Sequence, residues 1–98
     1  MKITSESNNG NLKMCIEGKI DTLTAPELNM AISSIPNDIT SLTLDMTNVS
    51  YVSSAGLRVL LSAQKQMNEI GSMKLTNVCE EVMEILEMTG FSDFLTIE

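Results

Sequence analysis

The spacing of apolar residues along this chain alternates between two periods. Residues 12–17 and 41–46 place apolar side chains at every second position, as a strand with one buried face does. Residues 24–35 and 55–70 place them at every third or fourth position, which is typical of an amphipathic helix. Strands that alternate with helices form crossover units around a largely parallel sheet. The spacing therefore predicts an α/β fold.

The chain is expected to begin with an antiparallel hairpin. Lys2–Ser7 and Leu12–Glu17 are alternating segments, and the sequence Asn-Asn-Gly-Asn at 8–11 joins them. Asn-Gly readily adopts the positive φ angles that tight hairpin turns require. Gly18 is expected to end the second strand.

Start and stop signals place the later elements. Thr24 and Glu27 have the spacing of a capping box, and Pro36 is expected to stop the helix that they open. The predicted order is ββαβαβαβ in one domain over residues 1–98, with a mixed sheet and with the helices mainly on one face. The remaining predicted elements are a strand over Ser41–Met46, a loop over Thr47–Ser50, a helix over Ala55–Ile70 that ends at Gly71, a strand over Met73–Asn77, a helix over Glu80–Met88 that ends at Gly90, and a last strand or extended tail over Phe94–Ile97.

Length and charge exclude several classes of protein. The 98 residues suffice for one domain with a core that needs no disulfide or metal. The net charge is −7 without a basic cluster, which argues against nucleic acid and anionic membrane surfaces as partners. No apolar run is long enough to span a bilayer, and the N-terminus lacks the apolar stretch of a secretory signal. We therefore expect a cytoplasmic protein.

The composition also argues against catalysis. Histidine is absent, which removes Ser-His and Cys-His nucleophiles and the usual zinc sites. The one classical base left for a serine at the start of the 55–70 helix is Lys65, about 16 Å further along that helix. Asp45 lacks the accompanying acidic residues of a receiver site, and Cys15 and Cys79 are interpreted as small, buried, reduced residues. We expect no enzyme activity, no metal and no cofactor.

The segment from Ser53 to Leu57 allows two interpretations. In the structural one, Ser53 or Ser54 caps the helix and Gly56 lets the backbone pack closely against a neighbour. In the functional one, a serine hydroxyl at a helix N-terminus accepts a phosphate that the free N–H groups stabilise, and Gly56 leaves room for a partner's active site.

Two stretches resemble the signatures of a known family. Gly18–Leu28 (GKIDTLTAPEL) and Val52–Leu60 (VSSAGLRVL) are similar to the two signature stretches of the STAS domain, and more narrowly of the stand-alone bacterial anti-sigma-factor antagonists. The resemblance covers the full length of the chain, including the Gly90-Phe91 turn. It implies an α/β STAS fold.

The resemblance also implies roles for individual residues. The phosphorylated serine of the family corresponds to Ser54, two residues before Gly56, and the family's aspartate beside that site corresponds to Asp21. Many members have aspartate directly before the phosphorylated serine, whereas this chain has Ser53, which remains the alternative acceptor. The residues implied to bind the partner or to border the phosphorylation site are Asp21, Thr22, Ser53, Ala55 and Gly56.

The function implied by the resemblance is partner switching in bacterial transcription regulation. Unphosphorylated members bind a GHKL-type serine-kinase anti-sigma factor and release the sigma factor. The kinase inactivates them with ATP, and a PP2C-type phosphatase restores them. Two alternatives remain: a STAS scaffold or transport-accessory module that binds a partner without phosphorylation, and a small serine-dependent enzyme.

Overall fold

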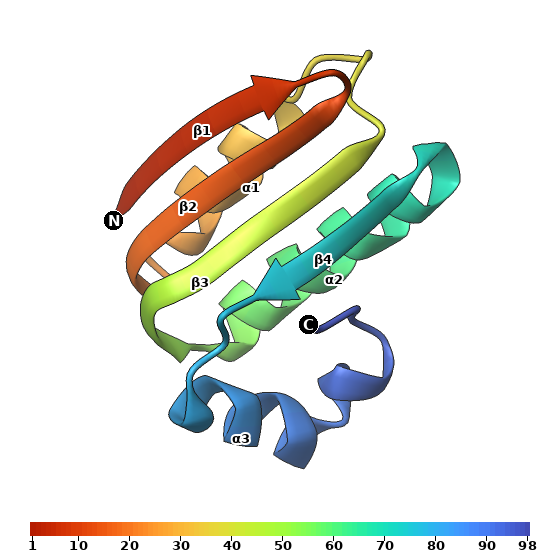
Figure 1. Cartoon of the computed structure of the whole chain (residues 1–98). Coiled ribbons are helices and arrows are strands. Elements are labelled where there is room, and N and C mark those ends of the chain that lie inside the picture. The colour runs from red at the N-terminus through yellow and green to blue at the C-terminus, as the bar shows by residue number, and fades with distance from the viewer.

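A mixed four-stranded sheet forms the centre of the computed structural model, which describes residues 1–98 (Figure 1). The first two strands are antiparallel, and the other neighbouring pairs are parallel. Asn9 and Gly10 make the hairpin turn with φ angles of 51° and 84°, as the Asn-Gly pair predicts. The strands are β1 (Lys2–Asn8), β2 (Asn11–Ile20), β3 (Ser41–Val52) and β4 (Ser72–Thr76), in that order across the sheet.

Two helices cover one face of the sheet. α1 (Ala25–Ser33) and α2 (Ser54–Ile70) lie next to each other behind the strands in Figure 1, whereas the opposite face carries no helix. α3 (Glu80–Thr89) lies near the carboxyl ends of β3 and β4, and it ends at Gly90 with a left-handed φ of 81°. None of the helices combines the length and apolar character needed to cross a membrane. The α/β fold with helices mainly on one face is confirmed.

The core lies between the sheet and these helices. The alternating apolar residues of β2 and β3 point into it, as predicted, and α2 contributes a stripe of apolar side chains. The largest fully buried side chains include Ile16, Leu28, Leu42, Leu44, Met46, Leu60, Met67 and Leu86.

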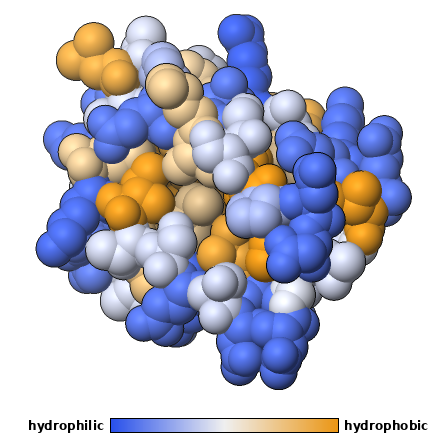
Figure 2. Space-filling view, turned by 90° about the horizontal axis from the view of Figure 1, so that it is seen from above, coloured by the Kyte–Doolittle hydropathy of each residue, from blue (hydrophilic) through white to orange (hydrophobic).

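Several large apolar side chains remain outside the core. Figure 2 shows the end of the molecule at the top of Figure 1, where apolar residues are exposed among polar ones. The carboxyl ends of the parallel strands lie at the opposite end. The exposed large apolar residues of the whole chain are Leu23, Met30, Tyr51, Ile70, Met88 and Phe94.

The strand prediction for the middle of the chain is wrong in its length. β3 continues through the expected loop at 47–50 to Val52, and β2 continues past Gly18 to Ile20. The pairing of these strands has two register shifts, and Gly18 has a φ of 109°. Each shift leaves an extra residue in β3, which is a β-bulge that interrupts the apolar alternation. The apolar spacing of residues 47–52 therefore does not indicate a strand.

The last predicted strand is also shorter than expected. A 3₁₀ turn, η1 (Phe91–Asp93), follows Gly90, and residues 94–98 make one parallel bridge, between Leu75 and Ile97. Gln64, the one buried polar residue of the core, holds this tail because its Oε1 accepts a hydrogen bond from the Thr96 N–H at 3.0 Å. The Gln64 side chain and two backbone hydrogen bonds with Leu75, from the Leu75 N–H to the Thr96 carbonyl oxygen at 2.8 Å and from the Glu98 N–H to the Leu75 carbonyl oxygen at 2.9 Å, therefore fix the C-terminal segment together.

The two cysteines are free, as predicted, but only half-buried. The Cys15 side chain lies on the uncovered face of the sheet, 3.9 Å from Asp45 Oδ2. Cys79 precedes α3, and its thiol donates to the carbonyl oxygen of Val49. The interpretation of both as buried residues is therefore wrong, because Cys15 lies on the uncovered face of β2 and Cys79 lies at the start of α3.

Asp45 is the centre of a polar cluster on the uncovered face of the sheet. Its Oδ1 accepts hydrogen bonds from the Thr47 N–H at 3.0 Å, from the Thr47 hydroxyl, and from Asn77 Nδ2 at 3.2 Å. Its Oδ2 lies 3.7 Å from Lys13 Nζ. These contacts, the Thr47 hydroxyl foremost, lower the pKa of Asp45 to about 2 from the ordinary 3.8.

Stability is expected to fall in acid partly through Asp45. Its folded pKa lies below the unfolded one, so its contribution is complete above about pH 5 and is lost as the pH falls through about 2. The full difference corresponds to about 2 kcal/mol, which screening by nearby water reduces to about 1 kcal/mol. Urea unfolding at pH 6 and pH 2.5 measures this loss, which should be smaller in Asp45→Asn than in wild type. Asp38→Asn is the control, and an equal loss in wild type and Asp45→Asn would contradict the assignment.

Candidate functional site

Two connections meet at the carboxyl ends of β2 and β3. The first, residues 21–24, leads from β2 into α1, and the second is Ser53, between β3 and α2. The Ser53 N–H donates a 2.8 Å hydrogen bond to the carbonyl oxygen of Ile20, directly before Asp21. Since neighbouring parallel strands bring their carboxyl ends to one edge, the two motifs come together although they lie about 30 residues apart in the sequence.

The two serines occupy different positions. Ser53 is the N-cap of α2, with an extended backbone (φ −84°, ψ 175°), and its Oγ accepts a hydrogen bond from the Gly56 N–H at 3.3 Å. Ser54 is the first residue of the helix, and its side chain is exposed. The sequence allowed either serine as the N-cap of α2, and in the structure it is Ser53. Ser54 therefore has the more accessible hydroxyl.

Asp21 organises the turn that enters α1. Its Oδ1 accepts hydrogen bonds from the backbone N–H groups of Leu23 at 3.0 Å and Thr24 at 3.1 Å. These bonds, the one from Thr24 first, lower the pKa of Asp21 below its usual value. The carboxylate is therefore ionised and held in a fixed position near the start of α2.

The capping box predicted for α1 is wrong. Thr24 has a helical backbone, and its side chain caps no N–H of the helix. Its hydroxyl instead donates to the carbonyl oxygen of Lys19 at 2.7 Å and accepts from the Asp21 N–H at 2.8 Å. The Asp21 side chain and Thr24 thus close an Asx-type turn, in which local side-chain bonds replace the cap.

Asp21→Asn is expected to remove the negative charge of Asp21 while it preserves the hydrogen bonds that form this turn. An asparagine Oδ1 can accept the same two N–H groups, so the thermal midpoint should change little. Asp21→Ala removes the acceptor and should lower the midpoint clearly. Thermal unfolding followed by circular dichroism measures both variants. Equal midpoints for Asp21→Ala and wild type would contradict the structural role of the turn.

Gly56 lies beneath the surface at the first turn of α2. A Cβ at this position would lie 2.7 Å from Ile20 Cγ2, 2.8 Å from the Ile20 carbonyl oxygen and 2.9 Å from Val52 Cγ1. The absent side chain thus makes room for the ends of β2 and β3. The expectation that Gly56 leaves space for a partner's active site is not met, because this space is already filled by the chain itself.

Gly56→Ala is therefore expected to destabilise the domain. Alanine favours a helix over glycine by about 1 kcal/mol. Overpacking costs about 1–3 kcal/mol, and a carbonyl oxygen among the contacts places this cost at the upper end. The net loss should be about 1–2 kcal/mol in urea unfolding. Ser62→Ala, at an exposed position of α2, is the control and should be neutral or slightly stabilising; a Gly56→Ala variant as stable as this control would refute the packing argument.

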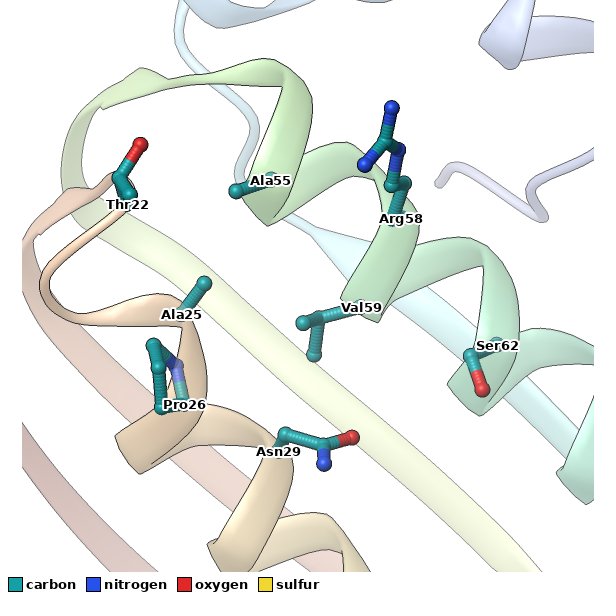
Figure 3. A pocket seen from close by; sticks show the side chains of 8 residues that line it. All are labelled: Thr22, Ala25, Pro26, Asn29, Ala55, Arg58, Val59 and Ser62. Carbon is teal, nitrogen blue, oxygen red and sulfur yellow. The ribbon is translucent and has the colours of Figure 1, made fainter.

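A groove runs between α1 and α2 beside this site. It has a volume of about 400 Å³, and small side chains such as Ala25 and Ala55 leave it open. Figure 3 shows Val59 pointing toward α1 and Arg58 extending from α2 in the opposite direction. This groove could not be predicted from the sequence, because it arises only where the two helices lie together. The residues that line it are Thr22, Ala25, Pro26, Asn29, Ala55, Arg58, Val59 and Ser62.

The structure thus groups the residues that the sequence singled out. Thr22 and Ala55 face one groove, Asp21 precedes Thr22, and Ser54 precedes Ala55 at the exposed start of α2. Arg58 is the one charged residue of the groove lining. This arrangement offers an accessible hydroxyl at a helix N-terminus next to a concave surface.

Comparisons with known proteins identify the family of this chain. A family model described as the STAS domain matches residues 2–98. The anti-sigma-B factor antagonist of Listeria monocytogenes is 30% identical over 96 residues, which cover 95% of this chain and 83% of the relative.

Solved structures give the same fold. An anti-sigma factor antagonist from Mycobacterium paratuberculosis has a TM-score of 0.86 at 22% identity, with 98% of this chain and 83% of that chain covered. The phosphorylated form of the Bacillus cell fate determinant SpoIIAA has a TM-score of 0.75 at 14% identity, with 99% and 91% covered. The match of the family model over nearly every residue and the identity to the Listeria protein establish that this chain belongs to the STAS domain family, among the anti-sigma factor antagonists.

Proposed function

We propose that this chain is an antagonist of a serine-kinase anti-sigma factor and that phosphorylation of Ser54 switches it off. The observation that carries the proposal is the difference between the two serines. Ser53 Oγ caps α2, whereas Ser54 is exposed at the first position of that helix. Its family membership supports the class of partner, and a phosphorylated structure of a protein with this fold supports the kind of switch.

In the proposed cycle, the unphosphorylated chain binds the anti-sigma factor and thereby frees the sigma factor in the cytoplasm. The kinase then transfers the γ-phosphoryl group of ATP to Ser54 Oγ, which loses its proton, and ADP leaves. A phosphatase of the PP2C type hydrolyses the phosphoserine to serine and inorganic phosphate. Ser54 is a substrate in both steps, so the chain acts as a regulator and not as an enzyme.

The local structure is suited to carry the phosphate without unfolding. The first turn of α2 contains no acidic residue, and the free N–H groups of a helix N-terminus favour negative charge. Phosphorylation adds about −1.5 to −2 charges at neutral pH. Because the helix tolerates this charge, the effect must be on the surface that the partner contacts.

That surface has further features for a partner. Leu23, in the turn after Asp21, is 88% exposed, and Tyr51, two residues before Ser53, is 44% exposed. Leu23 belongs to the connection between β2 and α1, and Tyr51 is the next-to-last residue of β3, so both lie near the carboxyl ends of β2 and β3. Exposed apolar side chains around a polar centre are typical of sites that bind another protein.

Phosphate mapping tests the proposal. The chain is incubated with ATP and a GHKL-type serine-kinase anti-sigma factor from the same organism, and the modified peptide is sequenced by mass spectrometry. We expect one phosphate, on Ser54, in wild type and in Ser53→Ala, and none in Ser54→Ala. Phosphate on Ser53 would overturn the site assignment. Kinase binding without phosphate transfer would instead favour a STAS module that acts without phosphorylation.

A further inference from the structure

We infer that Arg58 binds the phosphate on Ser54 once that serine is modified. The inference rests on the proposed phosphorylation of Ser54 and adds a residue that neither the family match nor the two signature stretches assign to the switch. It follows from the position of Arg58 on α2, four residues after Ser54.

Residues four apart on a helix are neighbours, with Cβ atoms about 5–6 Å from each other. Helical side chains also lean toward the N-terminus of their helix, so a long side chain covers the turn that precedes it. Arg58 therefore reaches back toward the first turn of α2, where Ser54 is exposed. A negative group placed four residues before a positive one is the favourable order for such a pair.

Arg58 is free to take this partner. It is the single arginine of the chain, it is exposed, and the three ion pairs of the structure involve Lys2, Lys13 and Lys74 instead. Figure 3 shows its guanidinium extended away from the floor of the groove. The first turn of α2 contributes no acid that would compete for it.

The other charged groups near this turn do not replace Arg58. The Asp21 carboxylate accepts N–H groups of its own turn and would repel a phosphate. The charge of Lys19 acts on Asp21, whose pKa it helps to lower. Lys65 is eleven residues beyond Ser54, about 16 Å along the helix.

The chemistry of the pair is a charge-assisted hydrogen bond. A guanidinium presents parallel N–H donors that match two phosphate oxygens, which a lysine ammonium cannot do. The phosphate would then be held by the N–H groups of the first turn and by Arg58 together. Phosphorylation would also withdraw the one cation of the groove lining from any partner, so the switch would change two charges of this surface at once.

The test uses protein with phosphoserine incorporated genetically at position 54, so that no kinase is needed. The pKa of the phosphate is measured by ³¹P NMR titration in wild type, Arg58→Gln and Lys65→Gln, with circular dichroism to verify folding. We expect the phosphate pKa to be higher in Arg58→Gln than in wild type by a few tenths of a unit to about one unit. Lys65→Gln removes the same charge from the same helix and should leave the value unchanged.

Arg58→Lys should restore only part of the difference, because it keeps the charge and loses the paired donors. An unchanged pKa in Arg58→Gln, or an equal change in Lys65→Gln, would overturn the assignment of Arg58. These outcomes are independent of kinase mapping, so a failure of the proposed function and a failure of this inference can be told apart.

Discussion

Phosphorylation of Ser54 is expected to weaken binding of this chain to its anti-sigma factor by roughly 30-fold to several thousand-fold. A phosphate that meets no counter-charge on the partner, on a surface that no longer offers that partner the Arg58 cation, costs about 2–5 kcal/mol when the interface buries it, and each tenfold in affinity corresponds to about 1.4 kcal/mol. Titration calorimetry with the unmodified chain and with the chain that carries phosphoserine at position 54 measures the difference.

Three variants serve as controls for this result. Ser54→Ala should bind like wild type and resist inactivation by ATP. Ser54→Asp supplies one charge with less bulk, so its affinity should lie between those of the unmodified and phosphorylated chains. Ser53→Ala loses the cap of α2 but should keep the switch. A phosphorylated chain that binds within threefold of the unmodified one would refute the switch.

Gly71→Ala is expected to cause the largest loss of stability among the five possible Gly→Ala substitutions in this chain. A Cβ on Gly71 would overlap the backbone carbonyl of Thr40, with its oxygen, carbon and Cα all within reach. That same carbonyl accepts the Ser72 N–H at 2.9 Å, the bond that starts β4 beside β3. Because backbone must move on both sides, we expect a loss of more than about 3 kcal/mol, or failure to fold.

Gly90→Ala provides the matched comparison for this variant. Gly90 has a left-handed φ of 81°, and a Cβ there would meet no atom within 4 Å. Its replacement should therefore cost only the conformational strain, about 1–2 kcal/mol. Urea unfolding of both variants measures the difference. A Gly71→Ala chain as stable as Gly90→Ala would show that the contact with Thr40 relaxes easily.

The succession of elements could be predicted because it depends on local patterns. The hairpin follows from Asn9-Gly10. The buried faces of β2 and β3 follow from the alternation of apolar and polar residues, which is visible within a few consecutive positions. The serine pair and Gly56 could likewise be recognised as a helix start, and the family resemblance that they carry is confirmed.

Several features of the site depend on contacts between distant residues. The extension of β3 to Val52 needs the bulged pairing with β2, and Ser53 is joined to the end of β2 by its bond to Ile20. Thr24 does not cap α1 because its hydroxyl finds the Lys19 carbonyl instead. The local spacing of residues in the sequence does not reveal these hydrogen-bonding and strand-pairing partners.

The sequence by itself determined most of the strands and helices, apart from the extension of β3 to Val52 and the C-terminal tail, because backbone preference and apolar period act over a few neighbouring residues. Only the tertiary structure decided what lies beside Ser54. The groove between α1 and α2 and the fit of Gly56 against Ile20 exist because parallel strands bring the ends of separate segments to one edge. Such contacts depend on how the elements pack, and packing brings together residues that are far apart in the sequence. Local patterns in the sequence therefore do not reveal them.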